Sequence, residues 1–380
     1  MDFEPTEAQA AVAATARSFA EKRVAPAAAE NDRLARFPAD LVRGLGELGL
    51  LCANVPAEHG GSEAGAVAYA LALMEISAAD CSLAITMSVT NMVAEAIARF
   101  GSEAQKARCL PRLASAEWPA GSFALSEPQS GSDAAGLATR AVRRGDGWVL
   151  DGQKQWVTAG AEAGVFVVFA RTDPVAGTLG ITAFLLEAGT PGLSVGKHEE
   201  KMGLRASSTV ALLLEGCAVP DSAVLGRPGQ GFTIALAALD GGRIGIASQA
   251  TGTIRAALQA SVRYARERTT FGKPIAEHQA VAFMLADMKT AHDAARLMAI
   301  RAAFLKEQGR AFTREASMAK LFASEAAQRA VDRAVQIHGG YGYTSEFPVE
   351  RLFRDARVQT IYEGTSEIQR LVIARDLLQG

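Results

Sequence analysis

The chain has 380 residues, more than one compact core usually holds, so two or three domains are expected and a single small module is excluded. The 39 lysines and arginines nearly balance the 41 aspartates and glutamates, which excludes the strong net charge of proteins that bind nucleic acid or anionic membranes. Hydrophobic residues make up 49% of the sequence and charged residues 21%, which excludes long disordered segments and predicts a folded protein.

The cysteines and the first residues bear on the cellular compartment. The four cysteines are far apart, and no C-x-x-C pair or histidine cluster accompanies them, so neither a disulfide framework nor a metal site is predicted. Residues 1–10, MDFEPTEAQA, lack the basic and apolar regions of a signal peptide, and no run of 18 apolar residues is free of charges. We therefore expect a soluble, cytoplasmic protein without a metal ion.

Residues 1–116 have the pattern of an α-helical domain. Thr6 with Gln9, and Ser102 with Gln105, have the spacing of a capping box, in which two side chains satisfy the free N–H groups at the start of a helix. Residues 82–100 carry regularly spaced apolar side chains without Pro or Gly, which predicts a largely buried helix.

Residues 117–223 have a different texture and predict a mostly antiparallel β domain. Short apolar runs rich in β-branched residues predict strands at residues 148–150, 156–158, 165–169, 181–186 and 209–214. Asp151–Gly152 separates the first two runs and predicts a two-residue hairpin turn, because such turns need positive φ angles that Asp and Gly tolerate.

Residues 224–380 return to helical periodicity. The apolar pattern predicts four helices, at about residues 232–266, 281–308, 313–337 and from 366. Helices of this length joined by short connections are typical of a bundle. The expected fold class is therefore α+β and multidomain: an N-terminal α-helical domain, a middle antiparallel β domain and a C-terminal four-helix bundle.

Common enzyme fingerprints are absent or out of place. The sequence has neither the G-x-G-x-x-G of a dinucleotide-binding fold nor the G-x-x-x-x-G-K-[ST] of a phosphate-binding loop. Residues 192–196, GLSVG, have the G-x-S-x-G form of a serine-hydrolase elbow, which needs a strand before it and a helix after it. Pro191 precedes this segment and a charged run follows it, so an ordinary loop is the favoured interpretation.

Two further segments allow a functional and a structural interpretation. The loop at residues 123–133 is dense in Gly and Ser, so its N–H groups and hydroxyls suit an anion or a polar heterocycle, but a solvated turn has the same composition. Glu363 precedes the last predicted helix, where a carboxylate is suited to catalysis but is also a favourable partner of the helix dipole. Spacing alone does not decide between the functional and the structural interpretation.

Five segments together resemble the acyl-CoA dehydrogenase family, and the resemblance runs nearly end to end. They are LSEPQSGSD at 125–133, QWVTAG at 155–160, ERTTFGKPIAEHQ at 267–279, QIHGGYGYT at 336–344 and RDARVQTIYEGTSEIQR at 354–370. The resemblance implies FAD-dependent α,β-dehydrogenation of an acyl-CoA to the trans-2-enoyl-CoA, as in fatty acid β-oxidation. Glu363 matches the base that takes the α-proton, and flavin N5 accepts the β-hydride.

The resemblance also implies binding roles for individual residues. Positions around the flavin are matched by Phe123, Leu125, Ser126, Gly131, Ser132, Trp156 and Thr158. Positions near the FAD pyrophosphate and adenosine are matched by Thr365 and Glu367. Positions that reach FAD from a neighbouring subunit are matched by Arg268, Phe271, Gln279, Gln336 and Gly340. Positions that contact the substrate are matched by Ser132, Asp240, Arg243, Tyr362 and Gly364.

The implied partners are an acyl-CoA and electron-transferring flavoprotein, in a homotetramer arranged as a dimer of dimers. Gly242 stands where isovaleryl- and long-chain-type members carry their catalytic Glu, which favours a short-chain enzyme. The segment LRASS at 204–208 resembles short branched-chain members as much, so a short branched-chain enzyme stays open. The nearest alternative is an acyl-CoA oxidase or a nitroalkane-oxidising relative on the same fold. A flavin-free helical scaffold is a further alternative, and the intact Glu363 and Thr158 positions argue against it.

Overall fold

The computed structural model describes residues 4–379. Its first part is helical, and α1 and α6 each begin with the predicted capping box: Thr6 and Ser102 each accept a hydrogen bond of 3.3 Å from the N–H of Gln9 and Gln105, respectively. The helices are α1 (Glu7–Phe19), the π-helical η1 (Ala20–Val24), α2 (Ala25–Leu34), α3 (Ala39–Glu47), α4 (Ala66–Ala79), α5 (Cys81–Phe100) and α6 (Glu103–Ala114).

Helix α5 is long and apolar enough to cross a membrane by length and composition, and it is the one described helix that is. However, 89% of its apolar window is buried inside the structure, where α5 packs against α4, α6, strand β1 (Ala120–Ala124) and helix α7 (Gly231–Glu267). Its hydrophobic surface is therefore accounted for by the interior of this protein, as is usual for a core helix.

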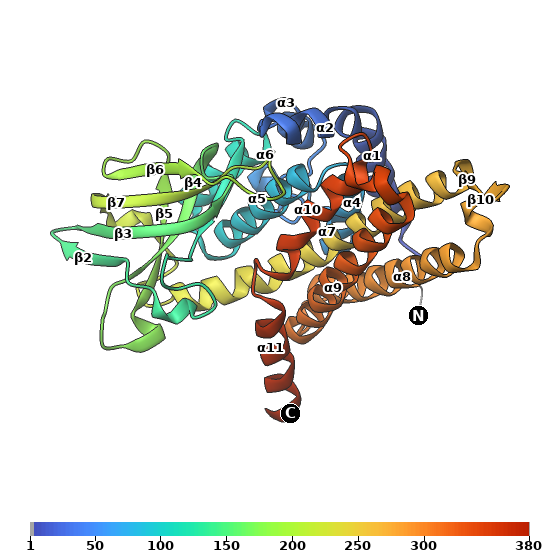
Figure 1. The fold of residues 1–380 in the computed structure, drawn as a ribbon. Helices are drawn as coiled ribbons and strands as arrows, with labels where there is room; N and C mark the ends of the chain where they lie inside the picture. Colours follow the sequence, from blue (N-terminus) through green and yellow to red (C-terminus); the bar gives the residue numbers. More distant parts are fainter. Residues whose placement is uncertain (1–3, 380) are drawn as a thin grey trace.

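The middle part is one eight-stranded sheet that lies at one end of the molecule, where the start of the long helix α7 packs against it (Figure 1). The strand order is β6-β7-β3-β2-β4-β5-β8, with β1 added beside β4. Strands β1 and β2 pair with β4 in parallel and all other pairs are antiparallel. The remaining bounds are β2 (Arg140–Arg144), β3 (Gly147–Thr158), β4 (Ala163–Arg171), β5 (Ile181–Glu187), β6 (Leu193–His198), β7 (Thr209–Pro220) and β8 (Val224–Leu225).

The predicted hairpin at Asp151–Gly152 is wrong, because β3 continues through it as a single strand with a bulge. A Cβ atom at Gly152 would lie 2.5 Å from Thr139 Oγ1, so glycine is needed there for close approach to a neighbouring segment. The turn between β2 and β3 lies at residues 145–146 instead, where Gly145 has a φ of 57°.

The G-x-S-x-G segment is largely part of a strand, β6, so the ordinary loop expected there is wrong, and the context of a hydrolase elbow is missing as expected. Ser194 lies on β6 at the edge of the sheet and is exposed, and β7 follows instead of a helix. A serine nucleophile at an elbow needs the strand–turn–helix context that is missing here.

The C-terminal part is built on three long helices, α7, α8 (Gln279–Glu307) and α9 (Thr313–His338), which pack against one another. Helix α11 (Ser366–Gln379) lies against α9 and projects away from the body of the molecule (Figure 1). The short helix α10 (Pro348–Ala356) was not predicted. A two-stranded hairpin, β9 (Thr269–Thr270) and β10 (Lys273–Pro274), joins α7 to α8. The expected fold class is confirmed.

Helix α10 ties the three parts together. The Asp355 carboxylate accepts a 2.6 Å hydrogen bond from the N–H of Leu204 in the β6–β7 connection. Arg354 pairs with Asp32 of α2 at 2.7 Å and donates to the carbonyl of Met202. Burial raises the pKa of Asp355 to about 7. The sheet is therefore fixed to both helical parts beside the segment that carries the candidate base.

Candidate active site

Glu363 lies in a short turn between the last 3₁₀ turn, residues 357–360, and α11. Its φ is 51°, and that of Gly364 is 92°, so two consecutive residues are left-handed. This conformation costs a residue with a side chain about 1–2 kcal/mol, and such strain is concentrated at functional sites. The backbone therefore turns abruptly at the residue that the sequence singled out.

The carboxyl group of Glu363 points at α7. Both of its oxygens are buried and accept no hydrogen bond from any of residues 4–379. A Cβ atom at Gly242 would lie 2.0 Å from Glu363 Oε2, so the missing side chain at position 242 provides the space for this carboxyl. Burial raises the pKa of Glu363 to about 7, against the charges of Lys320 and Arg243. A carboxylate with such a pKa suits general-base work near neutral pH.

Asp240 and Arg243, the predicted CoA contacts, lie on α7 next to Gly242 and pair with each other at 2.6 Å. Asp240 also accepts a 2.6 Å hydrogen bond from the Thr313 hydroxyl. Arg243 is only 5% exposed, and burial lowers its pKa. The pair is therefore largely enclosed, and the charge of Arg243 acts on Glu363 from within the helical part.

Tyr362 is anchored behind the candidate base. Its hydroxyl donates a hydrogen bond to the side-chain carbonyl of Gln249 on α7, and the Gln249 amide donates to the carbonyl of Cys81 at 2.9 Å. Burial raises the pKa of Tyr362 well above its usual range. The sequence analysis did not predict Gln249 as a site residue. The available signal was that Gln249 ends the run GRIGIASQ, 242–249, which begins at Gly242.

The predicted flavin loop and the end of β3 lie together. Phe123 is on β1, Leu125 and Ser126 follow it, and the N–H of Gln155 donates to the carbonyl of Ser126 at 2.9 Å. The hydroxyl of Ser122 donates to the carbonyl of Thr158 at 2.7 Å. The structure therefore places the start of the loop, with Phe123, Leu125 and Ser126, beside the end of β3, with Trp156 and Thr158, and Gly131 and Ser132 follow in the same loop.

This surface fits a planar cofactor. Trp156 has a φ of 61° and is 61% exposed, which is unusual for a strand tryptophan and leaves its ring free to be covered. A Cβ atom at Gly131 would meet no atom within 4 Å, so there is open space above the loop. An exposed aromatic ring beside a loop rich in N–H groups and hydroxyls suits the flavin of FAD.

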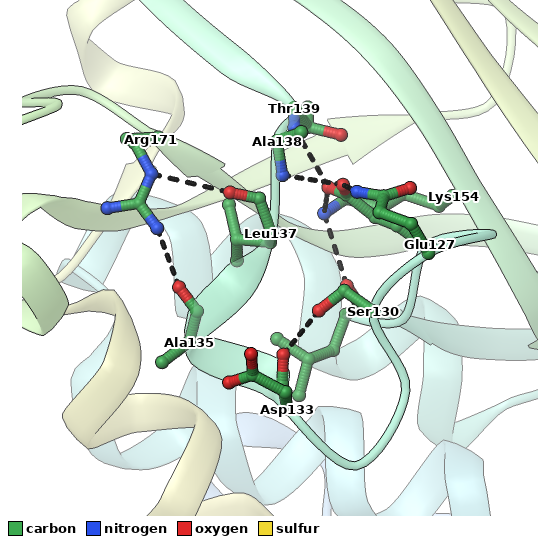
Figure 2. A network of polar contacts seen from close by, with 11 residues as sticks. Glu127, Ser130, Asp133, Ala135, Leu137, Ala138, Thr139, Lys154 and Arg171 are labelled. Carbon is green, nitrogen blue, oxygen red and sulfur yellow. Dashed lines mark hydrogen bonds and ion pairs between the residues drawn. The ribbon is translucent and has the colours of Figure 1, made fainter.

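A buried ion pair supports the candidate flavin-binding loop, residues 125–133 (Figure 2). Lys154 on β3 is fully buried, and its Nζ lies 2.6 Å from Glu127 and 3.2 Å from the carbonyl of Leu125. Glu127 also accepts hydrogen bonds from the N–H groups of Ala138 and Thr139, at 2.6 and 3.0 Å. The start of the loop, at Leu125 and Glu127, is therefore tied both to β3 and to the segment 138–139.

The pKa values of Glu127 and Lys154 are both shifted by their burial and by their pairing. Burial acts to raise the pKa of Glu127, but the charge and hydrogen bond of Lys154 outweigh it and lower this pKa to about 2. Burial lowers the pKa of Lys154 to about 8. Sequence reasoning missed both residues, because a Glu and a Lys separated by 27 positions carry no signal that they pair.

The start of α11 forms a second part of the candidate cofactor site. The Thr365 hydroxyl accepts a hydrogen bond from the N–H of Ile368, and the hydroxyl oxygen of Ser366 is buried without a partner among the described residues. The dipole of a helix N-terminus suits a phosphate group, so this end of α11 fits the FAD pyrophosphate. A cavity of about 280 Å³ here is lined by Glu325, Arg357, Thr360, Ile361, Thr365, Ser366 and Glu367.

The remaining predicted residues lie elsewhere. Arg268 follows α7, and its guanidinium lies over the ring of Tyr341 at 5.9 Å, beside the end of α9. Position 268 is 26 residues along α7 from Gly242, or about 40 Å at 1.5 Å per residue. Within one chain, the residues predicted to reach a neighbouring FAD therefore lie far from Glu363, at the other end of α7. They are Arg268, Phe271, Gln279, Gln336 and Gly340.

Three family models match successive parts of the chain. They are described as acyl-CoA dehydrogenase, N-terminal domain, over residues 6–117, middle domain, over 122–217, and C-terminal domain, over 229–378. Together they cover most of the sequence in the order in which the helical, β and helical parts occur.

Individual proteins agree with these models. The chain is 50% identical over 367 residues to the short-chain specific acyl-CoA dehydrogenase of Mus musculus mitochondria, covering 96% of this chain and 89% of that protein. The structure of butyryl-CoA dehydrogenase from Megasphaera elsdenii superposes with a TM-score of 0.97 at 43% identity over the whole of both chains. A chain from a structure of the electron transferring flavoprotein of Acidaminococcus fermentans superposes with a TM-score of 0.98 at 44% identity, also over both whole chains.

Proposed function

Because the chain belongs to the acyl-CoA dehydrogenase family of FAD-dependent oxidoreductases, we propose that it converts a short-chain acyl-CoA to the trans-2-enoyl-CoA with Glu363 as the base. One observation carries the proposal: the Glu363 carboxyl is buried, lacks a hydrogen-bond partner among residues 4–379 and occupies the space that Gly242 leaves. A base in a dry site is what abstraction of a weakly acidic α-proton requires.

The residues of this chain have distinct proposed tasks. Glu363 accepts the α-proton, and its backbone N–H donates a hydrogen bond to the thioester oxygen while negative charge develops there. The loop at 125–133, the end of β3 and the start of α11 hold the cofactor. FAD, when bound, supplies the two-electron acceptor that takes the hydride from the β-carbon. The neighbouring Asp240–Arg243 pair contacts CoA.

The function is tested by the visible spectrum of the purified protein. We expect flavin absorption that bleaches when butyryl-CoA is added without oxygen, because the electrons then stay on the cofactor. Bleaching that fails with every acyl-CoA offered would contradict the proposal. Reoxidation by electron-transferring flavoprotein faster than by air identifies a dehydrogenase, in line with the structural relative from Acidaminococcus fermentans. The reverse order identifies an oxidase.

We expect a preference for acyl chains of roughly four to five carbons. Gly242, Gly245 and Gln249 lie on one stripe of α7, at i, i+3 and i+7, and span about 10 Å. A Cβ atom at Gly245 would lie 2.4 Å from the Ser88 hydroxyl, so the packing is already tight there. The hydrogen-bonded Gln249 and Tyr362 close the stripe with polar groups, which disfavours a longer apolar chain.

Reduction rates with butyryl-, isobutyryl-, 2-methylbutyryl-, octanoyl- and palmitoyl-CoA check this preference. Each further methylene buried in a fitting pocket contributes about 0.8 kcal/mol, so a long-chain enzyme shows efficiency that climbs with length. A maximum at octanoyl-CoA or beyond would contradict the short-chain assignment. A branched substrate that is better than butyryl-CoA would assign the enzyme to the short branched-chain group.

We expect a homotetramer arranged as a dimer of dimers. Arg268 lies about 40 Å from Gly242 along one continuous helix, so it and the four predicted residues grouped with it complete a cofactor site only if that site belongs to another copy. Phe271 in this set is 96% exposed, as a residue awaiting a partner would be. A stable FAD-loaded monomer in light scattering would contradict the assembly.

The variant Arg268→Ala is expected to lose FAD more readily than wild type, while the fraction that keeps FAD is reduced by acyl-CoA at a rate closer to that of wild type. The control variant Arg266→Ala, which alters an exposed arginine, is expected to retain FAD.

A further inference from the structure

Lys320 on α9 is a buried cation that the proposed chemistry does not yet use. Its side chain is fully buried, and its Nζ donates a 2.7 Å hydrogen bond to the carbonyl of Gly364. Among residues 4–379, no carboxylate oxygen lies within 4.0 Å of this nitrogen. A buried lysine without a contact ion pair is costly to a fold, and such groups are concentrated at functional sites.

The hydrogen bond of Lys320 ends on the strained turn. Gly364 and Glu363 are both left-handed, and Gln369 of α11, also fully buried, donates to their carbonyls at 2.9 and 3.2 Å. Two donors from two helices therefore hold the two peptide groups that set the direction of the Glu363 side chain. Without them, the backbone would be free to relax to a more favourable conformation and withdraw the carboxyl from its position beside Gly242.

The charge of Lys320 also acts on Glu363. The titratable groups that face Glu363 are Lys320 from α9, Arg243 from α7, the Tyr69 hydroxyl from α4 and the adjacent Tyr362. Arg243 is neutralised locally by Asp240 at 2.6 Å, whereas Lys320 has no such partner among the described residues. Burial lowers the pKa of Lys320 to about 8, and the charge of Arg243 acts in the same direction, whereas Glu363, Glu367 of α11 and Glu325 of α9 act against it. Lys320 is therefore largely protonated at neutral pH.

We propose that Lys320 is a positioning residue for the proposed dehydrogenation: its ammonium group fixes the Gly364 carbonyl, and with it the turn that directs Glu363, and its charge keeps that carboxylate ready to accept the α-proton. The inference rests on the proposed role of Glu363. Lys320 has two proposed effects on Glu363. The first is to hold the turn, which Gln369 also does through its hydrogen bonds. The second is to act on the carboxylate through a positive charge, which Gln369 does not carry.

Three variants distinguish these effects in the FAD-loaded protein. Lys320→Met removes donor and charge at nearly constant volume, and should slow reduction by butyryl-CoA at pH 7 by at least about tenfold and move the pH midpoint of the rate upward. Gln369→Leu removes hydrogen bonds to the same turn without removing a charge, and should slow reduction while leaving the midpoint in place. Lys289→Met removes an exposed lysine of α8 and should change neither.

Infrared difference spectroscopy gives a readout independent of turnover. The carbonyl band of protonated Glu363, assigned by its loss in Glu363→Gln, should titrate at higher pH in Lys320→Met than in wild type, because loss of a nearby positive charge favours the neutral acid. If wild type is not reduced by any acyl-CoA, the proposed function fails, and this titration still decides whether Lys320 controls Glu363.

The following outcomes would overturn the inference. Lys320→Met with a rate within about twofold of wild type and an unchanged infrared midpoint would show that Lys320 does not act on Glu363. Lys320→Gln is the second variant, neutral but polar, and the same results are expected for it. Failure of both variants to fold or to hold FAD would assign Lys320 a purely structural role.

Discussion

Replacement of Glu363 by glutamine is expected to leave FAD bound while slowing flavin reduction by acyl-CoA on the order of 10² to 10⁴-fold. Glutamine has the shape of glutamate and fits the space beside Gly242, but its amide does not accept the α-proton. Stopped-flow bleaching under anaerobic conditions measures the loss directly. Glu346→Gln, which alters an exposed carboxylate, is the matched control and should be reduced at the wild-type rate.

The pH dependence sharpens this result. Burial raises the pKa of Glu363 to about 7, and only the ionised form is a base, so the wild-type rate should rise with pH through this value. The same shift has a cost for stability: the folded state holds the proton more tightly than the unfolded chain, so this residue destabilises the fold progressively as pH rises from about 4 to 7. A Glu363→Gln variant that bleaches as fast as wild type would remove Glu363 from the mechanism.

Removal of one partner of the Glu127–Lys154 pair is expected to have the largest effect on stability. Lys154→Met leaves the Glu127 carboxylate buried without its counter-ion, and breaking a buried pair in this way typically costs about 3–5 kcal/mol. The flavin loop loses its support at the same time, because Lys154 also holds the carbonyl of Leu125. We expect a lower denaturation midpoint and loss of FAD on dialysis.

The double variant Glu127→Leu/Lys154→Met tests whether the cost is that of an isolated charge. It should recover part of the stability, since no charge is then left buried, but not all of it, since the N–H groups of Ala138 and Thr139 lose their acceptor. Equal denaturation midpoints for wild type and Lys154→Met would show that the pair does not hold the loop.

Local signals in the sequence predicted local structure well. The capping boxes at Thr6 and Ser102 are present because both partners lie three residues apart in the sequence. Asp151–Gly152 failed because the same dipeptide suits a turn and a strand that passes close to Thr139, and only the fold decides between them. Helix α10 was missed because its nine residues are fewer than the roughly 11 or more over which helical periodicity is usually read.

The candidate site likewise has residues that a local motif predicted and residues that only the fold brings together. Glu363 stands out through a contiguous motif, and so do the flavin loop and the end of β3. The features that prepare Glu363 come from residues far away in the sequence: Gly242 clears its space, and Lys320 holds its turn. A glycine in a helix and a lysine in a helix are ordinary on their own, so their meaning follows only from the distances that the fold creates.

The space shared by Gly242 and Glu363 constrains the order in which these two positions can change. A methyl group at position 242 would overlap the carboxylate at 363, at 2.0 Å from Oε2, so a side chain there forces the Glu363 carboxyl out of its position. Once position 363 carries glycine, the same substitution meets chiefly the Met92 sulfur. The effect of a substitution at position 242 thus depends on which residue is present at position 363. A lineage on this fold that moves its carboxylate onto α7 is expected to pass through an inactive intermediate, or to change both positions at once.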